Sequence, residues 1–341
     1  MNGKKSLYLA WMTALGLLML LGIYTTVKLF GEGHWLFNTN DVLVWSMPLV
    51  VYVFLALSSS GLTLLSAIPI VFGVKRYKPV AKRLVLLAIA TLCGGFVSIG
   101  LELGNVWHLF YIIISPNFSS PIWWMGAIYG IELVFLAVKL WRMHVGDWDS
   151  GFSKAMGTAS FFCALIAPLM IGSVFGITES RVTYFGPVMS IYCLLMALLS
   201  GTALFVLYSM VYHKVLGNGS METNAEIYED FCLIFKYAAG AVVIFTIVKV
   251  AIEAATVVPE FLSIRKFVHP FGTLFGFHLE VVIGLFIPFI LLMIPSVLKS
   301  VGGKISIGAL AWFGALGRHM QILIAGQSHP IGPKAEQFPA V

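Results

Sequence analysis

Charged residues are scarce in this chain, and the common nucleotide-binding motifs are missing from it. Only 11% of its 341 residues are charged, whereas 59% are hydrophobic, which excludes an ordinary soluble domain. No GxGxxG, GKS or GKT loop occurs, so we expect no nucleotide site. The net charge of +6 is explained by membrane topology, as described below, and no nucleic-acid partner is expected.

Cysteines are also few, and none is spaced like a metal ligand. The four cysteines lack CxxC spacing, which argues against both a disulfide framework and an iron–sulfur cluster in this chain. No CxxCH motif is present, so covalently attached haem is excluded. A b-type haem needs facing histidines on two helices, and only His108, His278 and His319 lie in or near apolar segments. We therefore expect no haem.

Long apolar segments dominate what is present. A helix needs about 20 apolar residues to cross a membrane, and nine segments are long enough. Ten-residue alternating strands are missing, so the spans are expected to be helices. The first span is too long for a removable signal peptide and has no cleavage site, and we interpret it as a retained helix. The predicted spans are 6–30, 43–74, 84–104, 122–141, 154–178, 185–213, 231–257, 273–298 and 304–325.

The basic residues predict the orientation of these spans. Placing the N-terminus in the cytoplasm puts most lysines and arginines on the cytoplasmic side, Lys139 among them and above all the cluster Lys75–Arg83. Nine crossings then place the C-terminus outside. The connections between spans are short, which excludes a separate soluble domain.

One sequence motif occurs twice. Tyr-x2-Leu-x4-Ser-Gly-x2-Leu at Tyr52–Leu64 recurs at Tyr192–Leu204, an offset of 140 residues. If each copy opens a unit with an even number of membrane helices, the two units share one orientation and form a parallel repeat. Because the match is short, chance or a shared motif for packing small residues is the alternative explanation.

The outer connection 104–121 has a composition of its own. Val106–Ile114 is too short to cross the membrane, yet it is rich in aromatic side chains that suit a membrane interface. Ser115–Asn117 then interrupts it, and Ser120–Pro121 places proline near the first position of the next helix. We expect this segment to cap the mouth of a pocket.

Ionisable residues inside the spans are concentrated toward the outer leaflet. Such groups cost several kcal/mol in a membrane and need a partner or a water-filled cavity, so each is a functional candidate. Glu132 alone lies near mid-membrane, where it either relays protons or packs through hydrogen bonds. Lys249 and Glu253 are also compatible with a structural ion pair, and Arg318 with neutralising Glu280 or capping carbonyl groups. The full set is Glu102, Glu132, Lys249, Glu253, His278, Glu280, Arg318 and His319.

Several of these segments together resemble the NrfD/PsrC family, the integral membrane subunits of polysulfide-reductase-type complexes. The most specific elements are Leu101–Gly104, Ser115–Phe118 and Ser119–Trp124. Further similarity lies in Tyr52–Gly61 and in the closing segments, and the resemblance covers most of residues 43–327. The closing elements are Leu279-Glu280, Pro288, Pro295, Arg318 and Gly326-Gln327.

The resemblance implies an all-α integral membrane protein with two four-helix bundles, helices 2–5 and helices 6–9. This agrees with the offset of 140 residues and makes the first helix an N-terminal addition. The expected units are 1–42 with the first helix and an outer loop, 43–178 with the first bundle, 179–327 with the second bundle, and 328–341 as an extracytoplasmic tail.

The resemblance also implies a function. Such subunits lie in a bacterial or archaeal cytoplasmic membrane and carry no redox centre. They pass electrons between a quinone (menaquinone or ubiquinone) and an extracytoplasmic, ferredoxin-like iron–sulfur subunit, behind which stands a molybdenum catalytic subunit or a multihaem cytochrome. The quinone site is expected near the outer face of the first bundle.

Quinol oxidation releases two electrons and two protons, so the site needs a proton acceptor within hydrogen-bond reach of the hydroxyl groups. We predict Glu102 as the acceptor and donor, with Tyr52 or His108 as the second headgroup partner. Aromatic rings would wall the quinone by stacking. The predicted quinone-binding residues are Tyr52, Asn105, His108, Trp123, Trp124 and Arg181.

The chain departs from the family at two places. The family has polar Asn and His residues before the helix-2 motif, where this chain offers Leu49 and Tyr52, and Ala167 replaces a quinone-contacting tyrosine. We therefore expect the headgroup contacts to rest more on Glu102, Tyr52 and Arg181.

Three other functions remain open from the sequence. One is a proton translocator coupled to quinone chemistry. A second is a secondary transporter, although its breaks at Pro168 and Pro288 do not correspond between the halves. The third is a purely structural anchor. The candidate proton-pathway residues are Glu132, Glu253, His278, Glu280 and Arg318.

Overall fold

The structure is a computed structural model that describes residues 2–37, 39, 45–178, 186–216, 220–256, 278–325 and 327. In these ranges every regular element is a helix, and seven helices are long and apolar enough to cross a membrane. This confirms the expected all-α membrane protein. The seven are α1 (Asn2–Glu32), α2 (Met47–Ile70), α3 (Lys78–Glu102), α5 (Pro121–Val145), α6 (Gly151–Gly176), α7 (Val188–Leu216) and α8 (Ser220–Thr256).

The last two predicted spans are divided differently from the others. The described part of 273–298 forms the π-helix η5 (His278–Phe286), then α11 (Ile287–Leu291) and α12 (Pro295–Lys299). Pro295 is the first residue of α12 and follows the extended Ile294, so proline is tolerated there because the first helical amides need no helical acceptor. Pro288 is the second residue of α11, which continues directly from η5, so it lies where the π-helix gives way to α-helix. The span 304–325 forms α13 (Val301–Met320) and the π-helix η6 (Gln321–Ala325). Nine crossings thus remain a prediction.

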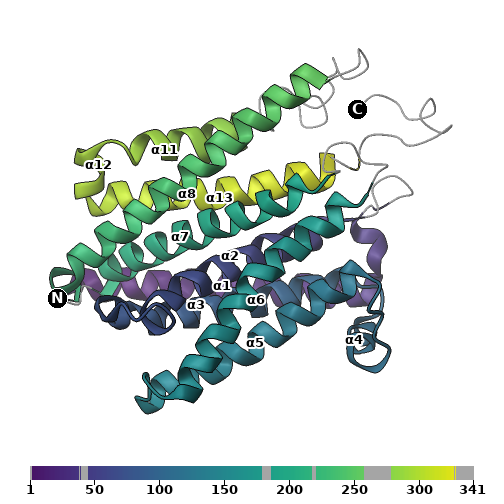
Figure 1. Cartoon of the computed structure of the whole chain (residues 1–341), viewed down its shortest axis with the longest axis horizontal. Coiled ribbons are helices and arrows are strands. Elements are labelled where there is room, and N and C mark those ends of the chain that lie inside the picture. Colours follow the sequence, from purple (N-terminus) through teal and green to yellow (C-terminus); the bar gives the residue numbers. More distant parts are fainter. Residues whose placement is uncertain are drawn as a thin grey trace.

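The helices run along a common direction, and their connections gather at two ends (Figure 1). We call the end where α3 finishes the Glu102 end, and the opposite end, which carries η2 (Lys75–Tyr77) and Arg83, the basic end. At the Glu102 end lie η1 (His34–Phe37), η3 (Val106–Phe110) and α4 (Tyr111–Ile114). Residues 106–114 therefore form two short helical turns and do not cross, as expected.

The two copies of the repeated motif meet each other at the crossing of α2 and α7. A Cβ atom on Gly201 would lie 2.6 Å from the carbonyl carbon of Gly61, and one on Gly61 would overlap the carbonyl oxygen of Ala197. Neither position has room for a larger residue, because helix backbone fills the space on the other side. The glycine of each copy therefore has a direct packing role at this crossing.

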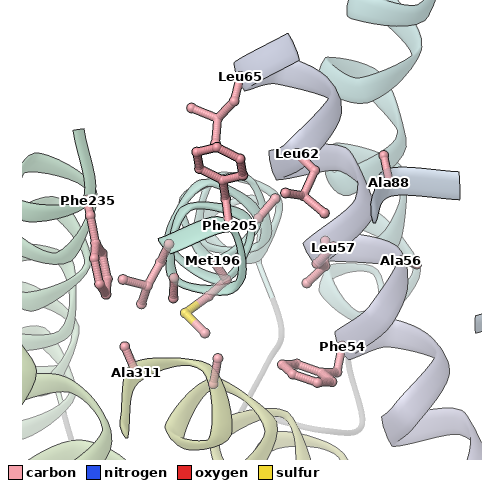
Figure 2. Close-up of a cluster of buried hydrophobic side chains, with 14 of the residues drawn as sticks. Phe54, Ala56, Leu57, Leu62, Leu65, Ala88, Met196, Phe205, Phe235 and Ala311 are labelled. Atoms are coloured by element: carbon pink, nitrogen blue, oxygen red, sulfur yellow. The ribbon is translucent and has the colours of Figure 1, made fainter. Parts of the chain in front are cut away.

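Apolar side chains fill the space around that crossing. Figure 2 shows Phe54, Leu57 and Leu62 of α2 facing Met196 and Phe205 of α7. Phe235 of α8 and Ala311 of α13 close the cluster from the other side. All of these side chains are almost fully buried. By contrast, nearly all the described side chains of α1 are exposed, which fits a helix that faces lipid.

The helix contacts follow the same pattern on either side of α2 and α7. α2 packs against α3 and α6, and α7 packs against α8 and α13. In the same way, α5 packs against α6, and η5 packs against α13. We call α2, α3, α5 and α6 the first half, and α7, α8, η5 and α13 the second half. The contacts that join the two halves are also matched, because α6 touches α7 and α13 touches α2.

Candidate functional site

Glu102 is the last residue of α3, and its carboxylate holds the beginning of α2. Oε1 accepts a hydrogen bond from the Ser46 backbone N–H (2.8 Å), and Oε2 accepts one from the Ser46 hydroxyl (2.5 Å). Ser46 is the N-cap residue of α2, so the negative charge lies near the positive end of that helix dipole. The Glu102 side chain is half-buried. It is therefore fixed in place and has a structural role as well as any chemical one.

Trp45 precedes this cap and is fixed by the end of the described chain. Gln327 accepts a hydrogen bond from the Trp45 N–H at Oε1 (2.8 Å) and donates from Nε2 to the Trp45 carbonyl oxygen (3.2 Å). The Trp45 ring meets Phe175 of α6 edge-on, with ring centroids 5.5 Å apart. Residues from three distant parts of the sequence thus meet beside Glu102.

Two further hydrogen bonds tie α3 to its surroundings at this end. Ser98 donates its hydroxyl hydrogen to the Pro48 carbonyl oxygen (2.7 Å), one turn before Glu102. His34 of η1 donates from Nε2 to the Leu101 carbonyl oxygen (3.1 Å). The position of Glu102 relative to α2 is therefore supported from both sides.

Tyr52 lies inside the bundle, six residues after Ser46 and roughly 9 Å deeper along α2. Its side chain is only 2% exposed. It meets the ring of Tyr129 on α5 edge-on, with centroids 6.4 Å apart. The Tyr129 oxygen in turn accepts a hydrogen bond from Ser60 (3.4 Å). The structure therefore places Tyr52 in the interior of the first half, below the cap.

Hydrogen bonds among its own residues hold the aromatic segment 105–124 at the Glu102 end in place. Asn105 caps η3 by accepting a hydrogen bond from the Trp107 N–H (3.1 Å). The Trp123 indole donates to the Ile112 carbonyl oxygen (2.8 Å), and the Trp124 indole to that of Phe118 (2.9 Å). Both indole N–H groups are thus used locally, and the Trp123 ring also meets the rings of Phe118 and Trp124 edge-on, with centroids 4.8 and 4.9 Å apart.

Two other residues were predicted to bind the quinone, His108 and Arg181. The exposed His108 ring stacks on Tyr111, with centroids 5.2 Å apart. Arg181 lies outside the described residues, so its predicted contact stays a prediction.

Of the predicted proton-pathway residues, Glu132 is fully buried in the middle of α5. Glu253 belongs to α8, and His278 and Glu280 belong to η5, but the positions of these three side chains lie outside the described set. An ion pair between Arg318 and Glu280, one of the two alternatives for Arg318, therefore stays a prediction.

Arg318 and His319 are both buried near the end of α13. The Arg318 guanidinium donates to the Thr246 hydroxyl (2.9 Å) and lies 5.9 Å from the centroid of the Tyr192 ring. His319 donates from Nδ1 to the Ala315 carbonyl oxygen (2.6 Å). The second half thus buries a cationic side chain close to the repeat motif.

Sequence reasoning missed four residues of this arrangement. Ser46, Trp45 and Gln327 build the cap, but their partners are too distant in sequence for a local pattern to reveal them. Lys139, which the topology argument assigned to the cytoplasmic side, is only 2% exposed and lies within α5. A signal for it existed, because Lys139 follows Glu132 by seven residues and so shares its helix face.

In the described ranges no group of three His, Cys, Asp or Glu side chains comes together. At the Glu102 end the available groups are a carboxylate, tyrosine, histidine and tryptophan rings, which suit hydrogen bonding and stacking to a planar ring.

Comparison with known proteins gives three named relatives. A dimethyl sulfoxide reductase membrane subunit from Halobacterium salinarum is 25% identical over 225 residues, which are 59% of this chain and 51% of that protein. A selenate reductase subunit from Mesobacillus selenatarsenatis is 20% identical over 158 residues, 46% of this chain and 36% of the relative. The Hdr-like menaquinol oxidoreductase integral membrane subunit from Archaeoglobus fulgidus is 24% identical over 151 residues, 43% and 37% of the two chains.

The chain spans about half or less of the length of these curated relatives. A family model covers far more of it. The model described as polysulphide reductase, NrfD, matches residues 35–330, from η1 to just beyond Gln327. This multi-pass membrane protein therefore belongs to the NrfD family.

Proposed function

We propose that the chain is the membrane-anchoring, quinone-interacting subunit of a multi-subunit respiratory oxidoreductase. It passes electrons between the quinone pool and an extracytoplasmic iron–sulfur subunit. The observation that carries the proposal is the fixed, half-buried Glu102 carboxylate at the mouth of a helix bundle that buries Tyr52. Family membership and the menaquinol oxidoreductase name of one relative support the choice of a quinone.

The proposed architecture has nine crossings in two four-helix bundles, 43–178 and 179–327, after the N-terminal unit 1–42. The matched helix contacts and the meeting of Gly61 with Gly201 support a pseudo-symmetric pair of bundles. The N-terminus lies in the cytoplasm, so the Glu102 end faces outside, and residues 328–341 form an outer tail. Basic residues concentrated at the other end support this orientation.

The chemistry follows from the groups at the Glu102 end. Oxidation of a quinol breaks two O–H bonds, and its two electrons pass to the iron–sulfur subunit. Glu102 accepts one of the protons, and the second proton leaves from the oxygen that Tyr52 or His108 holds. Trp123 and Trp124 offer ring faces at the rim. Asn105 and Arg181 complete the proposed set of headgroup contacts. Apolar helix faces admit the isoprenoid tail.

The proposed partner subunits supply the redox centres of the complex. The chain supplies the quinone site, and electrons leave or arrive through the docked iron–sulfur subunit. A molybdenum catalytic subunit or a multihaem cytochrome completes the complex. The names of the relatives, which are subunits of reductases, support catalytic partners of this kind.

Proton translocation by the second half is a second candidate function. The buried Arg318 and His319 on α13 favour it, because ionisable groups inside a membrane are costly and mark proton or ion pathways. Glu253, His278 and Glu280 would be the remaining pathway residues of this half, whereas the predicted pathway residue Glu132 lies in the first half.

The test of the proposed function is purification of the intact complex followed by solvent extraction and chromatography of bound quinone. We expect roughly one quinone per copy of this chain, and an absorbance spectrum in which no b-type haem is assigned to this subunit. A preparation that is active but neither retains nor binds quinone would contradict the proposal.

A further inference from the structure

One face of α5 carries ionisable residues through the interior of the first half. The buried residues of this helix are Tyr129, Glu132, Leu136, Lys139 and Met143, spaced alternately by three and four, so they form a single stripe. Two of the five carry ionisable groups of opposite charge. Such groups are rare inside membrane proteins unless they serve a pathway or pair with each other.

Lys139 is held by hydroxyl groups and not by a carboxylate. Its ammonium nitrogen donates to Ser66 of α2 (2.8 Å) and lies 3.5 Å from the hydroxyl oxygen of Ser160 on α6. Within the described ranges it forms no ion pair. A buried ammonium without an opposite charge in contact is costly, so a structural role alone does not explain a lysine at this position.

Glu132 lies on the same stripe, and the Lys139 charge and the Thr63 hydroxyl both act on it electrostatically. It is fully buried, and neither carboxyl oxygen has a hydrogen-bond partner among the described residues. The Thr63 hydroxyl lies beside it but donates to the Ser59 carbonyl oxygen (3.0 Å). Buried polar atoms without protein partners are typically satisfied by ordered water, and water is also what carries protons between side chains.

Polar side chains of α2 lie along the interval between Glu132 and Lys139. Glu132 and Lys139 are two turns apart, roughly 10 Å along the helix. Thr63 and Ser66 lie alongside this interval, and Ser66 donates its hydroxyl hydrogen to the Thr63 carbonyl oxygen (2.7 Å). The row continues toward the Glu102 end through Tyr129, which Ser60 contacts, to Tyr52.

The row also continues toward the basic end. Three residues beyond Lys139, Arg142 donates to Ser153 of α6 (3.2 Å) and forms an ion pair with Asp147 in the connection between α5 and α6. Ser160, the second neighbour of Lys139, lies on the same helix as Ser153. Polar groups thus extend from the connection at the basic end to the tyrosines below Glu102.

We propose that this row, from the Ser153 and Ser160 hydroxyl groups through Lys139 and Glu132 to Tyr52, is a proton path between the basic end and the quinone site. The inference rests on the proposed function. It adds that the quinone exchanges protons with the basic, cytoplasmic end of the protein. Transfer of a proton from the Lys139 ammonium to the Glu132 carboxylate leaves both groups neutral. The reverse transfer charges both, so the net charge of the interior stays constant.

The reaction balances with the partner named above. Quinone reduction takes two electrons from the iron–sulfur subunit and two protons, and forms two O–H bonds. At least one of these protons comes through Glu132, which Lys139 reprotonates from the basic end. Quinol oxidation runs the same steps in reverse. Because the electrons stay at the Glu102 end while a proton crosses the membrane, each turnover moves charge across it.

The experiment uses the whole complex reconstituted into liposomes, with a short-chain quinol, ferricyanide as the impermeant electron acceptor, and a potential-sensitive dye. Turnover is followed by ferricyanide bleaching and corrected with protein-free liposomes. Glu132→Gln and Lys139→Met are expected to lower turnover about tenfold or more and to remove the dye signal per turnover, with quinone affinity changed less than twofold.

Lys304→Met is the matched control, because Lys304 is a buried lysine on α13, outside the row.

Lys139→Arg separates proton transfer from structure. Arginine keeps the positive charge and the hydrogen bonds but does not release its proton, so this variant is expected to lose the dye signal as Lys139→Met does. A fully active Lys139→Arg, or wild-type turnover that moves no charge while quinone still binds, would overturn the path alone. Failure of the wild-type complex to bind quinone would overturn the proposed function and the path together.

Discussion

Replacing Glu102 with glutamine is expected to lower quinol-dependent turnover at least about 100-fold, the usual contribution of a general acid or base. Glutamine has the size of glutamate, and its amide can keep both contacts with Ser46, since the serine hydroxyl can accept as well as donate. It cannot take up or release a proton. Steady-state assays with a short-chain quinol, together with the thermal unfolding midpoint, separate the two effects.

Ser46→Ala is the companion variant for Glu102. It removes a hydroxyl contact from the carboxylate but leaves the acid itself, so we expect a lower unfolding midpoint and turnover within a few-fold of wild type. The reverse pattern would identify Glu102 as a helix cap alone: near-normal turnover in Glu102→Gln and a larger loss in Ser46→Ala.

Replacing Gly201 with alanine is expected to disrupt the packing of the two halves. The added Cβ atom would lie 2.6 Å from the Gly61 carbonyl carbon and 2.7 Å from the Leu62 nitrogen, and both are helix backbone that cannot rotate away. Overpacking of a buried contact costs roughly 1–3 kcal/mol, and backbone against backbone belongs at the upper end. We expect a large loss of monodisperse protein in detergent and a clearly lower unfolding midpoint.

Gly130→Ala is the matched control for this substitution. Gly130 also lies in a membrane helix, but no heavy atom lies within 4 Å of the position that its Cβ would take. This variant should behave like wild type. If Gly201→Ala were as stable as Gly130→Ala, the close crossing of α2 and α7 would be wrong.

Much of the helical framework could be predicted from the sequence, because a long apolar segment in a membrane has few alternatives to a helix. The structure gives α2 and α3 bounds of Met47–Ile70 and Lys78–Glu102, a few residues from the predicted 43–74 and 84–104. The spans near the C-terminus were harder. Two prolines lie in one of them, and the other, α13, carries the charged residues Lys304 and Arg318 near its two ends.

The site was predicted only where its signal is local. Glu102 stood out because it ends an apolar span before an aromatic segment, but its contact with Ser46 joins residues 56 positions apart. The Gln327 contact with Trp45 joins residues 282 positions apart. Lys139 was assigned to the cytoplasmic side, because it lies near the cytoplasmic end of the predicted span 122–141. Its burial depends on Ser66 and Ser160, which belong to other helices.

Photoaffinity labelling with an azidoquinone, followed by peptide mapping of the intact complex, tests the central claim most directly. Label is expected on the peptides around Trp45–Tyr52 and Glu102–Trp124, and excess unlabelled quinone should remove it. Saturable label confined to α7, α8 or α13 would contradict a quinone site at the Glu102 end of the first half.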